Sequence, residues 1–213
     1  MRSEERPKVG RPATYTPEQV LERLVGAAVE LLNEQAANAD FSVAQVAQRA
    51  KISKRTVYTV ISSKEELIDH IIRRGARVAT TLLELPVASA ADARAVLARF
   101  LTEWANFACG PQAVGIYVMA IRERSRFPAI GEAYYHSRSE HGLKQLTSWF
   151  TRMGKKKFCP VEDPEITADL ALTMAAAERQ RILALGIDAP FGPAELEARV
   201  RAIVHLVFRD QVA

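Results

Sequence analysis

The chain has 213 residues, of which 48% are hydrophobic and 25% charged, and its formal net charge is +4 at pH 7. This composition is ordinary for a globular protein with a buried core and argues against a disordered chain. No segment approaches the roughly 20 apolar residues that a membrane-spanning helix requires, and residues 1–10 lack the apolar stretch of a signal peptide. We therefore expect a cytoplasmic protein with no membrane segment.

Motifs of catalysis and metal binding are missing from the sequence. Neither cysteine stands in a CxxC or Cys/His spacing, and the four histidines are scattered without paired carboxylates. GxGxxG, P-loop, HExxH and GxSxG patterns do not occur. We expect no metal, no cofactor and no enzymatic activity.

Residues 1–75 divide into a polar arm and a set of short helices. Residues 1–15 mix basic residues with proline and glycine, which is typical of a flexible extended segment. Serine or threonine capping signals then predict helices over 16–34, 42–50 and 53–60, and a long helix that begins at 63. The first of these helices also has a proline at its first position, where a missing N–H costs nothing.

The remainder of the chain keeps the 3/4 spacing of apolar residues that is typical of helices. Breaks at glycine and proline predict helices near 90–109, 112–125, 129–153, 164–185 and 194–209. No segment shows the sustained alternation of a β-sheet. The sequence predicts an all-α fold of about nine helices, with an arm over 1–15, a helix-turn-helix unit over 16–75 and a larger helical unit over 76–213.

The window over 41–64 has a one-sided charge, because it contains no acidic residue. Ala47 is small where two helices of a tight helix-turn-helix would cross, and Val46, Ile52 and Val57 are apolar where they would fix the crossing angle. A surface that contacts phosphates needs this charge balance, whereas a solvated helix face is the ordinary explanation for a charge run. The two patterns together favour DNA binding. The basic residues are Arg49, Lys51, Lys54, Arg55 and Lys64.

This segment resembles the DNA-binding domain of the TetR (tetracycline-repressor) family. In that family a helix-turn-helix leads into a tyrosine-containing recognition helix and then into a Ser-Lys-Glu cap on the fourth helix, and residues 53–58 and 63–67 match those features. The similarity is close over 15–75. Beyond that range it is limited to helical architecture and an Arg-Phe-Pro element at 126–128.

Two positions depart from the family pattern. Lys51 stands where the family usually has glycine, and a non-glycine residue in a left-handed conformation costs roughly 1 kcal/mol. We therefore expect a slightly remodelled turn. Val60 and Ile61 stand where the family commonly has an aromatic or histidine pair, so contacts at the end of the recognition helix transfer less directly.

The resemblance implies that the third helix lies in the major groove. Lys54, Arg55 and Thr56 are then candidates for base edges, since arginine and lysine pair well with guanine. Lys64, with the free N–H groups at the start of the fourth helix, is expected to bind a phosphate. The full set of candidate DNA-binding residues is Ser42, Gln45, Ser53, Lys54, Arg55, Thr56, Tyr58, Thr59 and Lys64.

The other members of this set have secondary roles. Ser42 and Gln45 are placed to contact phosphates from the second helix, and Tyr58 and Thr59 to contact backbone or a thymine methyl group. A half-buried packing role is the alternative for Tyr58. The basic arm is a further candidate for an A·T-rich minor groove.

The family resemblance also implies a homodimer, because one helix-turn-helix covers little DNA and a two-fold pair presents half-sites about 34 Å apart. The last two helices carry apolar stripes, which are either a dimer interface or intrachain core. The candidate interface residues are Ile166, Leu170, Met174, Leu196, Val200, Ile203 and Val207.

A small-molecule pocket in the C-terminal unit is a third implication, and an apolar or amphipathic effector is the expected ligand. The candidate lining residues are Trp104, Phe107, Tyr117, Met119, Tyr134 and Trp149, with His136, Arg122 and Glu178 as polar anchors. Ordinary core packing is the alternative for each aromatic residue.

Together these features predict a dimeric, sequence-specific DNA-binding regulator, a repressor released from a palindromic operator by a small-molecule effector. A regulator without a small-molecule effector, controlled by a protein partner or by concentration, is a second hypothesis. A helical enzyme or scaffold in which residues 41–64 only pack is a third.

Overall fold

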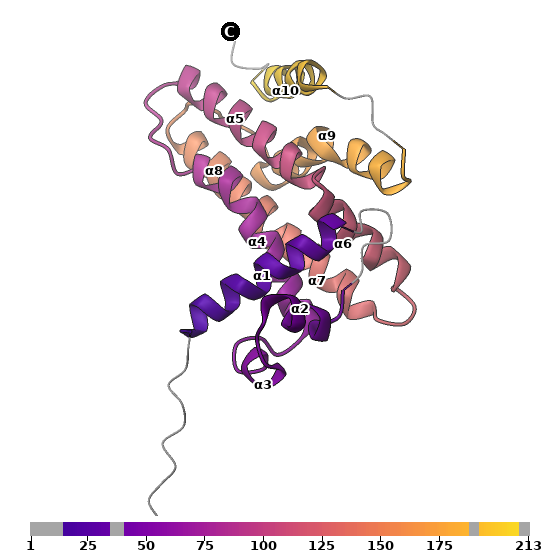
Figure 1. Cartoon of the computed structure of the whole chain (residues 1–213). Helices are drawn as coiled ribbons and strands as arrows, with labels where there is room; N and C mark the ends of the chain where they lie inside the picture. The colour runs from indigo at the N-terminus through magenta and orange to yellow at the C-terminus, as the bar shows by residue number, and fades with distance from the viewer. Residues whose placement is uncertain (1–14, 35–40, 188–191, 209–213) are drawn as a thin grey trace, which may run out of the picture.

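The computed structural model describes residues 15–34, 41–187 and 192–208, and every regular element in these segments is helical (Figure 1). In chain order the elements are α1 (Pro17–Glu34), α2 (Val43–Ala50), α3 (Lys54–Val57), α4 (Lys64–Leu82), α5 (Ala90–Ala108), α6 (Pro111–Arg122), α7 (Pro128–Arg138), the π-helical segment η1 (Ser139–Leu143), α8 (Lys144–Lys155), α9 (Pro164–Ala184) and α10 (Pro193–Val207). The predicted all-α fold is confirmed. Nearly all of the predicted arm lies outside the described residues.

Side-chain caps begin the N-terminal helices as the sequence predicts. At α1 the Thr16 N–H donates to Gln19 Oε1 at 2.9 Å, and the Gln19 N–H donates back to Thr16 Oγ1 at 3.3 Å. At α4 the Ser63 hydroxyl accepts the Glu66 N–H at 3.2 Å. The Glu66 carboxylate accepts from both the N–H and the hydroxyl of Ser62, each at 2.7 Å, so this cap extends one residue further than the predicted capping box.

Two clusters of buried side chains form the interior. The first contains the apolar faces of α1 to α3 and the first half of α4, and the second contains the end of α4, α5 and α8 to α10. Figure 1 shows α2 and α3 at one end of the molecule and α10 at the other. Ile116 and Met119 of α6 and Ile130 of α7 belong to the first cluster, although they follow residue 76. Helices from the larger unit therefore complete the N-terminal core.

Helix α4 connects the two clusters. Its Leu67, Ile68, Ile71 and Ile72 are buried in the first cluster, whereas Ala76, Ala79 and Leu83 at its end are buried in the second. Asp69 of α4 also accepts a hydrogen bond from the Ser137 hydroxyl at 2.7 Å and lies 3.1 Å from His141 Nε2. Helix α4, which follows α3, is thus fixed on both sides of its midpoint.

The sequence predicts one helix over 129–153, and the structure divides it into α7, η1 and α8. The π-turn is located where Gly142 meets the ring of Trp104, since a Cβ on this glycine would lie 2.3 Å from the ring. An extra residue in the turn lets the helix wrap a large side chain, which periodicity alone does not predict. None of the described helices combines the length and apolar character needed to cross a membrane.

Candidate nucleic-acid interface

The helix-turn-helix consists of α2, a three-residue turn and α3. Ser42 caps α2 in a full capping box, because its hydroxyl accepts the Gln45 N–H at 3.2 Å while its own N–H donates to Gln45 Oε1 at 2.7 Å. At the other end of α2, Lys51 has φ 56° and ψ 42°, a left-handed conformation. The N–H of Ile52 then donates to the Ala47 carbonyl at 2.9 Å. The turn closes with lysine where glycine is usual, so the backbone is retained at the cost of strain in this residue.

Buried apolar residues fix the angle between α2 and α3. Val46, Ala47, Ile52 and Val57 are at most 8% exposed, and all lie in the first cluster. Phe41, directly before the α2 cap, is buried beside them. The polar residues of α3 must therefore point outward.

The recognition segment is shorter than the predicted helix over 53–60. Ser53 caps α3 by accepting the Thr56 N–H at 3.1 Å, but α3 ends at Val57. The chain continues in tighter turns, in which the Thr59 N–H and its hydroxyl both bond to the Thr56 carbonyl, at 3.2 and 2.7 Å. β-Branched residues fill this segment and hydroxyl groups compete for carbonyls, which explains the early end.

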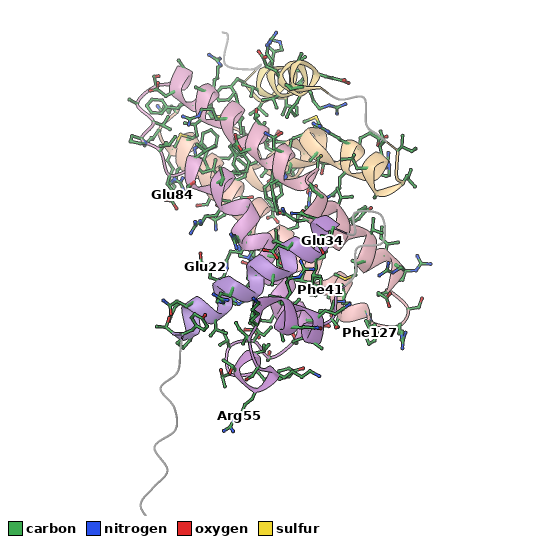
Figure 2. All side chains as sticks on the ribbon, in the orientation of Figure 1. Glu22, Glu34, Phe41, Arg55, Glu84 and Phe127 are labelled. Carbon is green, nitrogen blue, oxygen red and sulfur yellow. The ribbon has the colours of Figure 1, made fainter. Side chains whose placement is uncertain are left out.

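Residues predicted for base and backbone contact lie together on this exposed surface. Arg55 extends from α3 away from the body of the molecule (Figure 2). Tyr58 is 60% exposed, which excludes the half-buried packing role. The exposed members of the predicted set are Ser42, Gln45, Ser53, Lys54, Arg55, Thr56, Tyr58 and Thr59.

Lys64 occupies a different position from the rest of the set. It is the first residue of α4 and is partly buried, with its Nζ 4.9 Å from the centroid of the Phe41 ring. Such a contact between a cation and a ring holds the ammonium group beside Phe41, the residue that precedes the α2 cap. Lys64 therefore brings positive charge to the start of α4, next to α2.

Arg49 does not belong to the DNA-facing charge that the sequence predicts. Its guanidinium forms two hydrogen bonds of 2.8 Å to the Glu34 carboxylate and lies 3.5 Å from Glu30. These carboxylates raise the pKa of Arg49, and hydrogen bonding from Arg49 lowers the pKa of Glu34. The pair ties α2 to the end of α1 and neutralises one of the basic residues of the window.

The predicted pocket residues separate into two groups. Trp104, Phe107 and Tyr134 line one small cavity of about 50 Å³ between α4, α5, α6, α7 and α9. Tyr117 contacts Tyr134, with ring centroids 5.6 Å apart. Met119 is buried in the first cluster and Trp149 in the second, so both are core residues and their assignment to the pocket is wrong.

Beside the Tyr134 hydroxyl, the polar side chains of the cavity are Arg138 and Gln180, which are not among the residues predicted from the sequence. The predicted anchors Arg122, His136 and Glu178 do not line it. Gln180 lies four residues after the buried Ala176 on the inward face of α9, and that spacing is the signal that identifies it.

The residues predicted for dimerisation also separate. Leu196, Val200 and Ile203 are buried within the chain, which corrects their assignment to an interface. Ile166 and Leu170 are 59% and 53% exposed. Met174 and Val207 are partly exposed, and Leu206 of α10, which the sequence analysis left out, is 51% exposed.

The fold and the exposed recognition segment define a helix-turn-helix transcriptional regulator. Residues 24–71 match the bacterial regulatory proteins of the tetR family, and residues 95–210, more than half of the chain, match the C-terminal domain of AefR-like transcriptional repressors. The chain belongs to the TetR family of transcriptional regulators. Members of this family are non-enzymatic proteins that bind DNA operators and typically dimerise.

Solved structures share this fold. A TetR-family regulator from Mesorhizobium loti superposes with a TM-score of 0.71 at 19% identity, covering 92% of this chain and 98% of that one. A TetR regulator from Agrobacterium tumefaciens gives 0.69 at 18%, covering 92% and 94%. The flavonoid-responsive regulator FrrA gives 0.61 at 20%, covering 91% and 97%. No curated protein matches the sequence.

Proposed function

We propose that the chain is a dimeric, sequence-specific DNA-binding repressor that a small-molecule effector releases from a palindromic operator. A DNA-binding unit over 16–75 and a ligand-binding and dimerisation unit over 76–213 divide this work. The observation that carries the proposal is the recognition segment, in which Lys54, Arg55 and Thr56 are exposed on a helix-turn-helix within the acid-free window over 41–64.

Base recognition is assigned to α3. Lys54 and Arg55 present donors that match guanine O6 and N7, and each well-formed contact of this kind discriminates by about 1 to 3 kcal/mol. Lys64 and the capped start of α4 are assigned to a phosphate, which contributes affinity for every sequence. Ser42 and Gln45 already bond to each other, and their exposed edges remain available to a second phosphate.

The dimer interface is assigned to the outer faces of α9 and α10. Helix α9 has Ala168, Ala171 and Leu172 in the core and yet exposes Ile166 and Leu170 on the opposite side. A helix that is apolar on both sides requires partners on both sides. A second copy of the chain supplies the missing partner in a two-fold arrangement.

Selection of bound sites from random duplex DNA tests the proposal first. We expect a palindrome whose half-sites are separated by about one or more helical turns. With the selected site, Arg55→Ala is expected to relax recognition at one base pair, whereas Lys64→Ala weakens binding to all sequences and flattens the salt dependence by about one charge.

Arg49→Ala is the matched control, because this arginine is already neutralised by Glu34. We expect it to retain nearly the affinity of the unmodified chain. Salt-independent binding, or unchanged affinity in both the Arg55 and Lys64 variants, contradicts the proposed interface.

The oligomeric state is tested separately by light scattering. Leu170→Asp places a charge on the proposed interface and is expected to yield monomers and to weaken operator binding. Ile121→Asp on α6 is its control, since Ile121 is 49% exposed outside α9 and α10 and is expected to leave the dimer intact.

A further inference from the structure

The small cavity lined by Trp104, Phe107 and Tyr134 has too little room for a ligand in its present form. Its volume of about 50 Å³ is far below the roughly 300 Å³ of small-molecule pockets. Aromatic rings surround it, because Trp104, Phe107 and Tyr134 all line it. A ligand much larger than water must therefore displace side chains of the wall, and these rings are the largest of them.

The polar atoms at the cavity wall limit the ligand's chemistry. The Tyr134 hydroxyl donates to Gln180 Oε1 at 3.1 Å, and Gln180 Nε2 donates to the Ala108 carbonyl at 2.7 Å. Among the described residues that line the cavity, Arg138 is the only charged one, and its guanidinium forms an ion pair with the Asp169 carboxylate at 3.3 Å. An aromatic cage can attract a cation, but the guanidinium at the wall disfavours one here, and the carboxylate that pairs with it does not line the cavity. A flat apolar ring with a hydroxyl or carboxylate group fits this wall.

Two glycines allow the rings to close the cavity. A Cβ on Gly75 of α4 would lie 2.1 Å from Phe107 Cε2, and a Cβ on Gly142 of η1 would lie 2.3 Å from the Trp104 ring. Glycine inside a helix costs about 1 kcal/mol relative to alanine, so each position needs a reason, and close ring packing supplies it. No free space separates these rings from the helix backbones.

Gly75 lies between the two halves of α4. The preceding Ile71 and Ile72 are buried in the DNA-binding cluster, and the following Ala76 and Ala79 in the second cluster. A Phe107 ring that moves toward Gly75 pushes against the backbone of α4, whose first residue is Lys64. Packed interiors transmit such a displacement because they compress little.

We propose that this cavity binds a planar aromatic compound that bears a hydroxyl or carboxylate group and no positive charge, and that its entry displaces Phe107 against Gly75 and so weakens operator binding. The inference rests on the proposed function and names the ligand class and the residue pair that reports its binding. Leu172 and Ala176 of α9 supply the apolar wall opposite the rings.

Three naphthalene derivatives test the ligand class by titration calorimetry: 2-naphthol, 2-naphthoate and 2-(aminomethyl)naphthalene as its cation. The three share one ring system and differ in the head group. We expect the phenol and the carboxylate to bind at least about tenfold more tightly than the cation. Equal binding of all three, or no binding by any, overturns the ligand class.

An open groove of about 680 Å³ between α4, α5 and α10 is the competing location. Gln180→Leu removes the polar anchor of the small cavity and is expected to weaken binding of 2-naphthol. Arg99→Leu alters only the groove wall, so it is expected to leave binding unchanged. The reverse pattern places the ligand in the groove and overturns the proposal.

Glycine substitutions test the link to DNA in the full-length chain. Gly75→Ala is expected to reduce operator affinity about tenfold without any ligand, within the usual range of coupling between sites. Gly131→Ala is the matched control, because a Cβ on Gly131 of α7 meets nothing within 4 Å. Unreduced operator affinity in Gly75→Ala overturns the link and leaves the proposed function intact, provided that the unmodified chain binds its operator.

Phe107→Ala separates ligand binding from its consequence. The smaller side chain opens the cavity, so 2-naphthol is expected to bind at least as tightly as in the unmodified chain. Saturating 2-naphthol should lower the operator affinity of the unmodified chain about tenfold. It is expected to leave the operator affinity of Phe107→Ala unchanged. The double variant Gly75→Ala, Phe107→Ala should regain operator affinity, since the clash is gone. Operator release by 2-naphthol in Phe107→Ala contradicts the proposal.

Discussion

The N-terminal and C-terminal regions of this molecule depend on different kinds of interaction. In the N-terminal region, helices begin at side-chain caps formed by residues three positions apart, such as Ser42 with Gln45. In the C-terminal region, decisive contacts join residues far apart in sequence, such as Phe107 on Gly75 and Gln180 on the Ala108 carbonyl. Contacts between residues close in sequence form the surface proposed to contact DNA, whereas contacts between distant residues form the cavity.

The largest expected effect is the loss of stability caused by a substitution in α6, which tests whether the N-terminal core is independent of the C-terminal region. Met119 of α6 is fully buried among residues of the first cluster. Met119→Ala is expected to lower the free energy of unfolding by about 2 to 5 kcal/mol, because it leaves a cavity. Urea denaturation measures the loss. Ile121→Ala, two residues away and exposed, should change stability by less than about 0.5 kcal/mol, and equal losses for both would show that α6 does not support this core.

An intermediate effect concerns Asp69, where the two regions meet. Burial raises the pKa of Asp69, but hydrogen bonds from Ser137 and His141 and the charges of His141 and Arg73 together lower it below its ordinary value. Asp69→Asn is expected to cost about 1 kcal/mol, a figure reduced because this side chain is partly exposed.

The pH dependence of this effect has a definite sign. A carboxyl group whose pKa is lower in the folded state stabilises that state above its unfolded pKa of about 3.9. The difference between Asp69→Asn and the unmodified chain should therefore be constant at neutral pH and disappear as pH falls below about 4 through the lowered pKa. A difference that is independent of pH down to the acid transition argues against a charged Asp69 at this contact.

The smallest effect concerns the turn between α2 and α3. Lys51→Gly removes the strain of a left-handed lysine and is expected to stabilise the fold by about 0.5 to 1 kcal/mol. Thermal unfolding at two salt concentrations measures the gain. A destabilised variant would mean that the lysine side chain contributes more than its backbone costs.

The same contrast explains what could be predicted from the sequence. Capping boxes and apolar spacing identify the helices, and the acid-free window identifies the exposed recognition segment, because both signals lie within a few residues. The acid-free window also counts Arg49 among the charges available to DNA. The structure pairs it with Glu34 and Glu30 of another helix, which the window does not contain. Met119, Trp149 and Val200 resemble pocket or interface residues in the sequence, and only tertiary packing shows that they are core.

The shared core around α6 has a mechanical consequence. Since Ile116 and Met119 anchor the recognition unit from the far side of α4, that unit cannot swivel on a single flexible joint. Any change in the separation of two such units in a dimer must carry α6 along. A crosslink between α6 and α1 should then leave that change in separation possible, because the two helices move as one body.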